Sequence, residues 1–438
     1  MRDADKGNAR VATDERGGEN ASAPRADRPR VKILYIGGVG PFGGASRSLY
    51  EAVGAMPEGA IDAYFMMPDG TALDFYRRVA TDTLAVRGVS RFDHTRATHY
   101  RGRRWAVLLR EALHAVPTLT GLLRARHRWG RFDVVHINEF TEIFPGLIAK
   151  RLFGASLVVH VRALVNADRR LWRTRWLHRA LARSADAVIA IDETVRATLP
   201  ADLHVDVIHN SFSAKPREVP DQAYLAQFDR LRPSALKIGF VGNLLRMKGI
   251  VELIQAAAQV RDAGADVQFV IVGGSVAAPR GLVAAAARRA GLAQNAEEDV
   301  RALIAELGLS DVVFLLGATT DIQRVYSRMD ILAFPSFYDA PGRPVFEAAF
   351  FGVPSIVAVR APTPDTFVDG ETGIAIDAPT PEEIAAAVIQ LASDRAQIRR
   401  MGDAARLLAD RNFRPEANAA KLLTIYQRIT GPTHRLNK

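Results

Sequence analysis

The chain has 438 residues, of which 48% are apolar and 24% are charged. This length exceeds what one hydrophobic core usually supports, and the composition is that of a soluble globular protein, which excludes disordered, fibrous and membrane-spanning classes. The net charge is +10, and the absence of cysteine excludes disulfide frameworks, thiolate metal sites and cysteine nucleophiles.

The first 29 residues mix charged and small polar side chains, so we expect a disordered tail at 1–29. No apolar run follows a basic start, which argues against a secretory signal. No stretch approaches the roughly 18 apolar residues of a membrane span. We therefore expect a cytoplasmic protein whose membrane contact is at most peripheral, at the inner face of the cytoplasmic membrane.

The positive charge is concentrated in the first half. Residues 31–215 carry 26 Lys/Arg against 17 Asp/Glu, whereas residues 216–438 carry 25 of each. The arginines are densest around Trp105, Trp172 and Trp176. Two interpretations remain open: solvated helix faces, or a surface for an anionic partner such as a membrane.

The first half alternates predicted strands with helical patterns. An apolar run at 31–36 leads into a glycine-rich loop and then a helix. Further strands are predicted at 133–137, 156–161, 187–191 and 204–208. This alternation is typical of a parallel, doubly wound sheet, and it predicts a Rossmann-like domain over 30–215.

The second half repeats the pattern after a proline-containing linker expected at 216–235. Strands are predicted at 237–241, 267–272, 312–315, 331–334 and 355–359. We expect a second Rossmann-like domain at 236–415, with an enlarged helical connection at 275–295. A helix at 418–429, within a final segment 416–438, should pack back on the first domain. The predicted fold class is α/β, with two doubly wound domains facing across a cleft.

A candidate diphosphate site follows the first strand of the second domain. The loop 242–249 begins and ends with glycine and contains Arg246 and Lys248. Backbone donors and the positive end of the following helix suit a phosphate. Lys248 is equally compatible with a plain cation at a helix start. The next strand ends in Gly273–Gly274, a tight turn that would admit a ligand close to the backbone.

Two carboxylates follow the strand at 331–334. Asp339 lies in the loop and Glu347 lies eight residues later, near the start of a helix. Carboxylates at the carboxyl end of a strand can hold the vicinal hydroxyls of a ribose or hexose. A helix-start charge favoured by the helix dipole is the alternative interpretation of Glu347.

Taken in order, these motifs resemble the retaining nucleotide-sugar glycosyltransferases of family 4, which have the GT-B fold. The resemblance implies that Glu347 binds the donor ribose and Asp339 the transferred sugar. In the absence of a metal motif, the charge on the leaving nucleotide should be stabilised by Lys248, Arg246, Arg47 and helix N-termini. Asp339 stands where the family usually has glutamate, so its reach is one methylene shorter.

The same resemblance implies a set of donor-binding positions in both domains. These are Gly43, Gly44, Arg47, Gly242, Asn243, Gly273, Gly274, Gly342 and Arg343. Asn243 replaces the arginine that is usual in the family. Asn210, before the linker, and the loop that begins at Asp365 also resemble family segments.

A departure from the family occurs after the strand at 156–161. Many relatives have a histidine there, whereas this chain has Arg162, with His160 two residues earlier on the same face. Arg162 stays protonated, so it would stabilise the leaving phosphate or an anionic acceptor rather than act as a base. A packed core histidine is the alternative interpretation of His160.

No metal or resident cofactor is predicted. The Asp-x-Asp pattern occurs at Asp3–Asp5, within the expected tail, and nowhere else in the sequence. The expected partners are a nucleoside diphosphate sugar as donor substrate and a glycan acceptor, lipid-linked or polysaccharide, and no nucleic acid is expected. The resemblance implies hexose transfer with retention by same-face substitution.

Three other functions remain open at this point. A non-catalytic sugar-binding protein of the same fold would fit the departures at Asp339, Asn243 and Arg162. A nicotinamide-dependent oxidoreductase is suggested superficially by the glycines of 37–43, although their spacing differs from the dinucleotide fingerprint. An epimerase or a phosphorylase could use the same fold.

Overall fold

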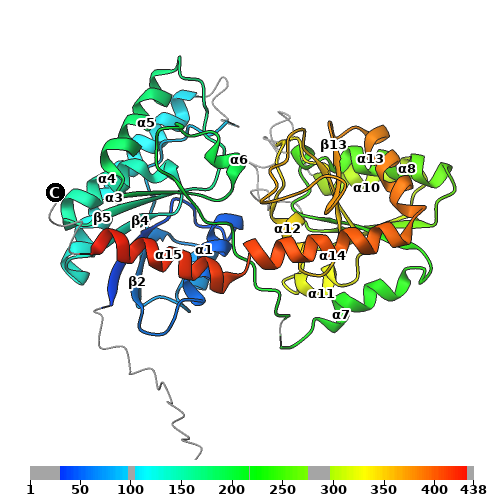
Figure 1. Cartoon of the computed structure of the whole chain (residues 1–438), viewed down its shortest axis with the longest axis horizontal. Helices are drawn as coiled ribbons and strands as arrows, with labels where there is room; N and C mark the ends of the chain where they lie inside the picture. The colour runs from blue at the N-terminus through cyan, green and yellow to red at the C-terminus, as the bar shows by residue number, and fades with distance from the viewer. Residues whose placement is uncertain (1–29, 97–103, 217, 275–295, 432–438) are drawn as a thin grey trace, which may run out of the picture. The chain divides into compact units, whose positions relative to one another are not determined.

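The computed structural model describes residues 30–96, 104–216, 218–274 and 296–431. The chain divides into residues 1–30 and one compact unit, 31–438. The expected tail and the expected enlarged connection at 275–295 therefore lie outside the described residues. The compact unit contains two parallel β-sheets with helices around them (Figure 1).

The first sheet has seven parallel strands in the order β3-β2-β1-β4-β5-β6-β7. Their bounds are β1 Val31–Ile36, β2 Ile61–Pro68, β3 Asp82–Val86, β4 Val134–Ile137, β5 Ser156–Val161, β6 Ala187–Ala190 and β7 Asp206–Val207. The helices of this half are α1 Gly44–Gly54, α2 Thr71–Tyr76, α3 Arg104–Trp129, η1 Phe140–Glu142, α4 Ile143–Phe153, α5 Trp172–Ser184 and α6 Glu193–Arg196. The strand order reverses between β1 and β4.

The second sheet has six strands in the order β10-β9-β8-β11-β12-β13. Their bounds are β8 Leu236–Val241, β9 Val267–Val272, β10 Val313–Gly317, β11 Ile331–Phe334, β12 Ser355–Ala358 and β13 Gly373–Ile376. The helices are α7 Gln222–Leu225, η2 Ala226–Arg230, η3 Arg246–Lys248, α8 Ile250–Asp262, α10 Ala296–Glu306, α11 Ile322–Tyr326, α12 Arg343–Ala349, α13 Pro381–Ala392, α14 Arg395–Asn412 and α15 Pro415–Thr430. Two doubly wound parallel sheets confirm the predicted fold class.

Each sheet is buried on both faces, which is why its strands read as continuous apolar runs. Every residue of β4 and β5 in the first sheet is buried, and so is every residue of β9 in the second. Four clusters of buried apolar side chains cover the two faces of the two sheets. The burial of both faces requires helices on each side, as in parallel α/β proteins.

Two segments connect the halves. Part of the expected linker forms α7 and η2, whose Tyr224 and Phe228 are buried in the same apolar cluster as β9 residues, so it is not a free connection. The last described helix, α15, lies against the first sheet: the Tyr426 hydroxyl is 2.7 Å from His136 Nδ1 and 3.1 Å from the Tyr35 hydroxyl (Figure 1).

Candidate functional site

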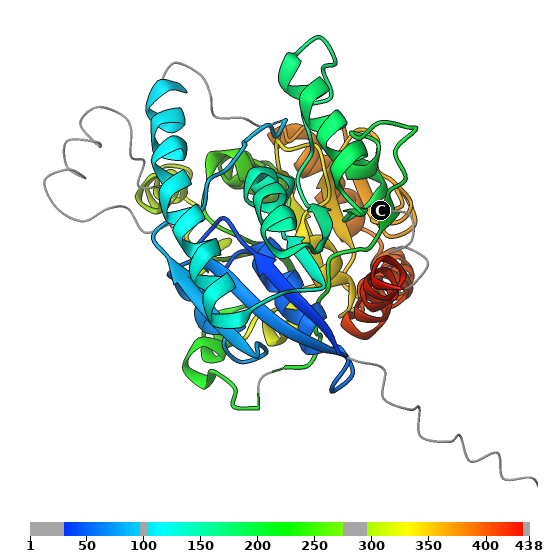
Figure 2. The same cartoon turned by 90° about the vertical axis from the view of Figure 1, so that its left-hand side faces the viewer.

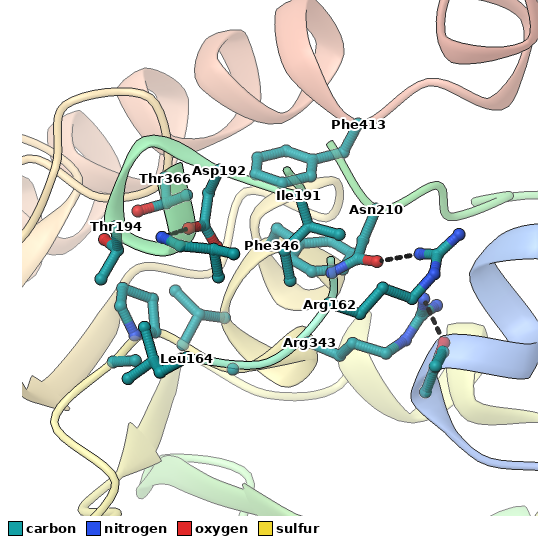
Figure 3. A pocket seen from close by; sticks show the side chains of 17 residues that line it. Arg162, Leu164, Ile191, Asp192, Thr194, Asn210, Arg343, Phe346, Thr366 and Phe413 are labelled. Carbon is teal, nitrogen blue, oxygen red and sulfur yellow. Dashed lines mark hydrogen bonds between the residues drawn. The ribbon is translucent and has the colours of Figure 1, made fainter. Parts of the chain in front are cut away.

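A cavity of about 260 Å³ lies where the carboxyl ends of strands from both sheets come together. The first half contributes Gly44, Arg162 and Asn210, and the second half contributes Arg343 and Phe346 (Figure 3). In doubly wound sheets, ligands bind where the strand order reverses, and the loops after β1 and β11 leave from such points. The fold therefore places this cavity at the expected ligand position.

The candidate diphosphate loop is shaped by glycines that no other residue can replace without strain. Gly242 and Gly273 have φ angles of 154° and 144°, and a Cβ on Gly273 would collide with the Gly242 carbonyl oxygen. Gly249 has φ of 72°, and a Cβ there would collide with the Pro335 carbonyl oxygen. The glycines therefore allow the loops after β8, β9 and β11 to approach one another closely.

Lys248 lies at the end of η3, next to the start of α8. Its ammonium nitrogen is 5.0 Å from the ring centres of both Phe334 and Tyr338, and burial lowers its pKa. Arg246 and Asn243, in contrast, are exposed. Helix α8 begins without a side-chain cap, so its first amide groups are available to an anion. The geometry suits a diphosphate, although the cavity described above does not reach these residues.

Asp339 is held in an unusual backbone conformation. Its φ is 52°, a positive value found at no other non-glycine position in the described part of the chain. Its carboxylate accepts hydrogen bonds from the Arg360 backbone at 3.0 Å and from the Arg360 Nε at 3.2 Å. Burial opposes ionisation, but the hydrogen bonds and charge of Arg360 outweigh it and keep the pKa of Asp339 below its usual value. The carboxylate is therefore an anion that already has a partner.

Glu347 is buried, and each of its carboxylate oxygens accepts a hydrogen bond from a neighbouring side chain. Its Oε1 accepts from Arg343 Nε at 2.8 Å, and its Oε2 accepts from the Tyr326 hydroxyl at 2.9 Å. Burial first, and then the Glu347 charge, raise the pKa of Tyr326 well above its usual value, so the phenol remains a donor. The side chain that the resemblance assigns to ribose is thus fixed in orientation.

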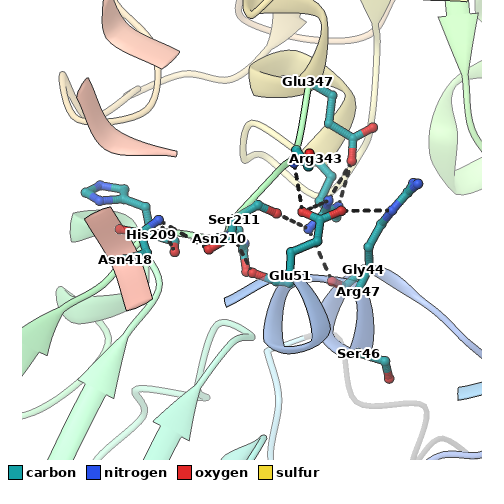
Figure 4. A network of polar contacts seen from close by, with 12 residues as sticks. Gly44, Ser46, Arg47, Glu51, His209, Asn210, Ser211, Arg343, Glu347 and Asn418 are labelled. Atoms are coloured by element: carbon teal, nitrogen blue, oxygen red, sulfur yellow. Dashed lines mark hydrogen bonds and ion pairs between the residues drawn. The ribbon is translucent and has the colours of Figure 1, made fainter. Parts of the chain in front are cut away.

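Arg343 also crosses to the first half of the chain. Its Nη1 donates to the carbonyl oxygens of Gly44 at 3.3 Å and Ser211 at 3.2 Å, and its Nη2 is 3.9 Å from Glu51 Oε2 (Figure 4). Arg47 Nε lies 3.3 Å from the other Glu51 oxygen. Two predicted donor-binding arginines therefore share one carboxylate, although the sequence analysis did not single out Glu51.

The environment of Glu51 disfavours its charged form despite the two arginines. Desolvation by burial is the largest effect and raises the pKa of Glu51 to about 7, with Arg343 and Arg47 opposing it. The spacing of four residues between Arg47 and Glu51 in α1 was a usable sequence signal for this pair.

His160 and Arg162 lie together, as the strand periodicity predicted. Arg162 donates to Asn138 Oδ1 and Asn210 Oδ1, each at 2.8 Å, and its Nη2 is 3.3 Å from His160 Nδ1. Burial and the Arg162 charge lower the pKa of His160 well below its usual value. His160 is therefore a neutral, packed side chain, whereas Arg162 lines the cavity.

A second, smaller cavity of about 150 Å³ lies in the first domain and shares Asn138 with the surroundings of Arg162. Two carboxyl groups line it. Burial, followed by the neighbouring Glu142, raises the pKa of Glu139 to about 8, and burial raises that of Glu142 to about 7, with Arg91 3.7 Å away opposing it. Neither carboxyl group was predicted from the sequence, although both closely follow the strand at 133–137, where ligand-binding side chains are expected.

A second contact between the halves involves the loop that resembles a family segment. His209 Nε2 lies 2.8 Å from Asp365 Oδ2, which also accepts from the Glu193 backbone at 3.0 Å. Figure 4 shows His209 next to Asn418 of α15, whose amide donates to the His209 carbonyl at 3.0 Å. Asp365 thus contributes to the junction between the halves.

Two doubly wound domains that share a cavity, with a glycine loop and basic side chains on each side, form the GT-B fold. Residues 43–210 match the glycosyl transferase 4-like domain, and residues 227–408 match the glycosyl transferases group 1. The chain belongs to the family 4 glycosyltransferases. This confirms the resemblance and disfavours the nicotinamide-dependent oxidoreductase.

Known proteins that resemble the chain are also glycosyltransferases or synthases. The MMP alpha-(1->4)-mannosyltransferase of Mycolicibacterium hassiacum is 26% identical over 319 residues, or 69% of this chain and 72% of that protein. The alpha-maltose-1-phosphate synthase of Mycolicibacterium smegmatis is 27% identical over 353 residues, or 74% of this chain and 86% of that one. The crystal structure of Anabaena HepE in complex with UDP and glucose has a TM-score of 0.68 at 18% identity, covering 90% and 99% of the two chains.

The described residues contain neither a candidate membrane-spanning helix nor a candidate metal-binding group. None of their helices combines the length and apolarity that a membrane crossing requires. Among the same residues, no three His, Asp or Glu side chains gather into a group that could hold a metal ion.

Proposed function

We propose that the protein is a retaining glycosyltransferase that moves a hexose from a nucleoside diphosphate sugar to a hydroxyl of a glycan acceptor. The observation that carries this proposal is the junction at Arg343, which contacts Glu347 beside it and the Gly44 carbonyl of the other domain. A donor bound by α12 would thus lie against the first-domain glycine loop.

The donor would lie along the second domain. Its diphosphate would meet the start of α8, Lys248 and Arg246, its ribose would meet Glu347, and its sugar would meet Asp339. The UDP complex of Anabaena HepE supports a nucleotide-sugar donor for this fold. For the sugar to bind Asp339, the Arg360 guanidinium must share or release that carboxylate.

The reaction would break the bond between the anomeric carbon and the diphosphate oxygen and form a bond from the same carbon to the acceptor oxygen. The acceptor proton would pass to the departing phosphate on the same face. Lys248 and Arg246 would stabilise the charge that develops on the diphosphate. In this proposal the protein's own cationic side chains stabilise the leaving group, so neither a metal nor a resident cofactor is needed.

The acceptor would bind in the first domain. The cavity beside Asn138, with Glu139 and Glu142, offers hydrogen-bonding carboxyl groups to sugar hydroxyls. The concentration of arginine in residues 31–215 supports a lipid-linked or polysaccharide acceptor at an anionic membrane surface, the inner face of the cytoplasmic membrane.

The test is a panel of UDP-, GDP- and ADP-sugars, with NAD as a comparison, assayed by thermal shift and then by turnover with NMR detection of the anomeric proton. We expect one nucleotide sugar to stabilise the protein, by about 2.7 kcal/mol at 100 times its dissociation constant. We also expect a product that keeps the donor's anomeric configuration. Binding of NAD alone, or an inverted product, would contradict the proposal.

A further inference from the structure

Helix α3 is apolar on the side that faces solvent as well as on the side that packs. Its buried side includes Leu122, Ala125 and Trp129, as expected for a helix that covers a sheet. Its opposite side exposes five large apolar side chains, 47–67% exposed, which we call the α3 face. These are Leu109, Leu113, Val116, Leu119 and Leu123.

The spacing of these residues makes the α3 face continuous. Successive members are three or four residues apart, so they line one side of the helix. Helix α4 packs beside α3 and exposes Phe144 and Ile148, and α3 (cyan) runs along the side turned to the viewer in Figure 2. Contiguous exposed apolar surface of this kind marks a surface that is covered in use.

A third cavity, of about 620 Å³, lies at the carboxyl ends of α3 and α4. Arg126, Arg131 and Arg151 line it, and within the described part of the chain none of their guanidinium groups has a hydrogen bond or ion pair. Lys32 also lines it but donates to the Trp129 carbonyl at 2.5 Å. We call these three arginines and their cavity the basic cavity.

The lining contains one carboxylate, which does not neutralise the basic cavity. Asp133 Oδ2 accepts the backbone N–H of Lys32 at 3.0 Å. Positive charge therefore remains in excess at the end of an apolar helix face. A surface of this composition matches a bilayer that has acyl chains in its interior and phosphate at its border.

We propose that the α3 face docks on an anionic phospholipid bilayer and that the basic cavity takes a lipid headgroup phosphate. A second copy of the chain is a poorer occupant, because the apolar side chains of another α3 face would offer no anion to the arginines of the basic cavity. The proposal extends the proposed function, because docking on a bilayer would bring the protein to a lipid-linked acceptor. It rests on the proposed function for that purpose only.

The site differs from the one that the sequence suggested. Trp176 packs with its ring centre 4.9 Å from those of Phe92 and Phe144, so it is not available to a membrane. Trp172 is 65% exposed, whereas the side chain of Trp105 lies outside the described residues. The membrane contact that we infer is therefore mainly aliphatic.

The test is co-sedimentation of the full chain with vesicles of phosphatidylcholine, with and without phosphatidylglycerol, at low and high salt. The variant L113Q/V116Q should bind all vesicles at least tenfold more weakly, since about this much is lost with two inserted apolar side chains. The matched control is L407Q, because Leu407 is as exposed as Val116, at 67%, but lies on α14. The control should bind as the unmodified chain does.

A second pair of variants tests the basic cavity. R126Q/R131Q/R151Q should weaken binding to phosphatidylglycerol vesicles by about a hundredfold at low salt and abolish the preference for the anionic lipid. The control R399Q/R406Q/R411Q removes the same charge from exposed positions of α14 and should keep the preference.

Three results of the vesicle and light-scattering experiments would overturn the proposal. They are an unmodified chain that ignores anionic vesicles at low salt, an L113Q/V116Q variant that binds normally, and light scattering that shows a dimer which L113Q/V116Q dissociates. Binding of inorganic phosphate by the basic cavity without vesicle binding would also contradict it. Hydrolysis of the soluble donor should be unchanged in every variant, so failure of vesicle binding is distinguishable from failure of the proposed transferase activity.

Discussion

The guanidinium of Arg343 holds the carboxylate of Glu347 one helical turn further along α12, with Nε and Nη2 both 2.8 Å from Oε1. The Tyr326 hydroxyl donates a hydrogen bond to the other carboxylate oxygen, Oε2. A carboxylate accepts about four hydrogen bonds, so the two from Arg343 Nε and the Tyr326 hydroxyl leave capacity for a ligand hydroxyl. The pair orients Glu347 before any nucleotide binds.

The substitution Glu347→Gln should weaken donor binding by roughly one to two decades. An amide presents one acceptor oxygen instead of two, and the loss of a charged acceptor costs about 1.5 to 3 kcal/mol. Calorimetry with the nucleotide sugar that the proposed panel identifies measures the change. Glu371→Gln, an exposed position of the second domain, is the control. Unchanged donor affinity would show that Glu347 only supports α12.

The substitution Lys248→Met should reduce kcat by about a hundredfold while changing donor affinity less, because the ammonium group meets charge that develops in the transition state. Methionine keeps the packing against Phe334 and Tyr338. Steady-state kinetics separates the two effects. Lys421→Met, on the exposed side of α15, should be silent. An equal loss in kcat and in affinity would assign Lys248 to ground-state binding.

Gly249→Ala should destabilise the protein more than Gly370→Ala does. Both glycines have φ of 72°, so both substitutions carry a similar backbone cost of about 1 kcal/mol. Only at Gly249 would the new methyl group meet a carbonyl oxygen, that of Pro335, whereas nothing lies near Gly370. Urea unfolding should therefore show a clear difference between the variants. Equal destabilisation would mean that the two loops can separate without cost.

Glu51 predicts a specific pH dependence. The pKa of Glu51 in the folded protein, about 7, lies above the ordinary value of 4.5, so the folded state binds this proton more tightly than the unfolded state does. Protonated Glu51 therefore stabilises the fold at low pH, and this contribution is lost as pH rises from about 5 to 7. Glu51→Gln should remove that part of the slope, so its stability relative to the unmodified chain should increase with pH. Chemical unfolding at several pH values checks this. A pH-independent difference would show that Glu51 is ionised throughout.

Turnover should persist in EDTA. The proposed stabilisation of the leaving diphosphate comes from Lys248, Arg246 and the start of α8. The assay compares treated enzyme with and without added magnesium or manganese. Activity that EDTA abolishes and either ion restores would contradict this prediction.

The sequence indicated every strand of both sheets except β2, β3 and β13, and the strands that it indicated include the edge strands β7 and β10. Strands such as β4 and β5 are buried on both faces and read as apolar runs. The strands β2, β3 and β13 were not predicted, because partly exposed residues interrupt their apolar runs, such as Asp62 in β2 and Asp82 in β3. Periodicity weakens wherever burial is incomplete.

The candidate site was predictable where it depends on local motifs and not where it depends on the meeting of two domains. The loop around Lys248 and the pair Asp339 and Glu347 stand out in the sequence. Glu51 becomes notable only because Arg343 arrives from the other domain. The partner of Asp339, Arg360, is likewise set by the fold, since it follows a different strand. Contacts between distant segments have no short-range signal.

The position of α15 determines when the first domain can complete its folding during synthesis. Its Tyr426 is completely buried and bonds to His136 in the first sheet, so it fills a gap in the core of the first domain. On the ribosome, that sheet emerges long before α15 is translated. The apolar surface that α15 covers therefore stays exposed on the first domain until the whole second sheet has been synthesised. We expect chaperones to bind the chain during that interval.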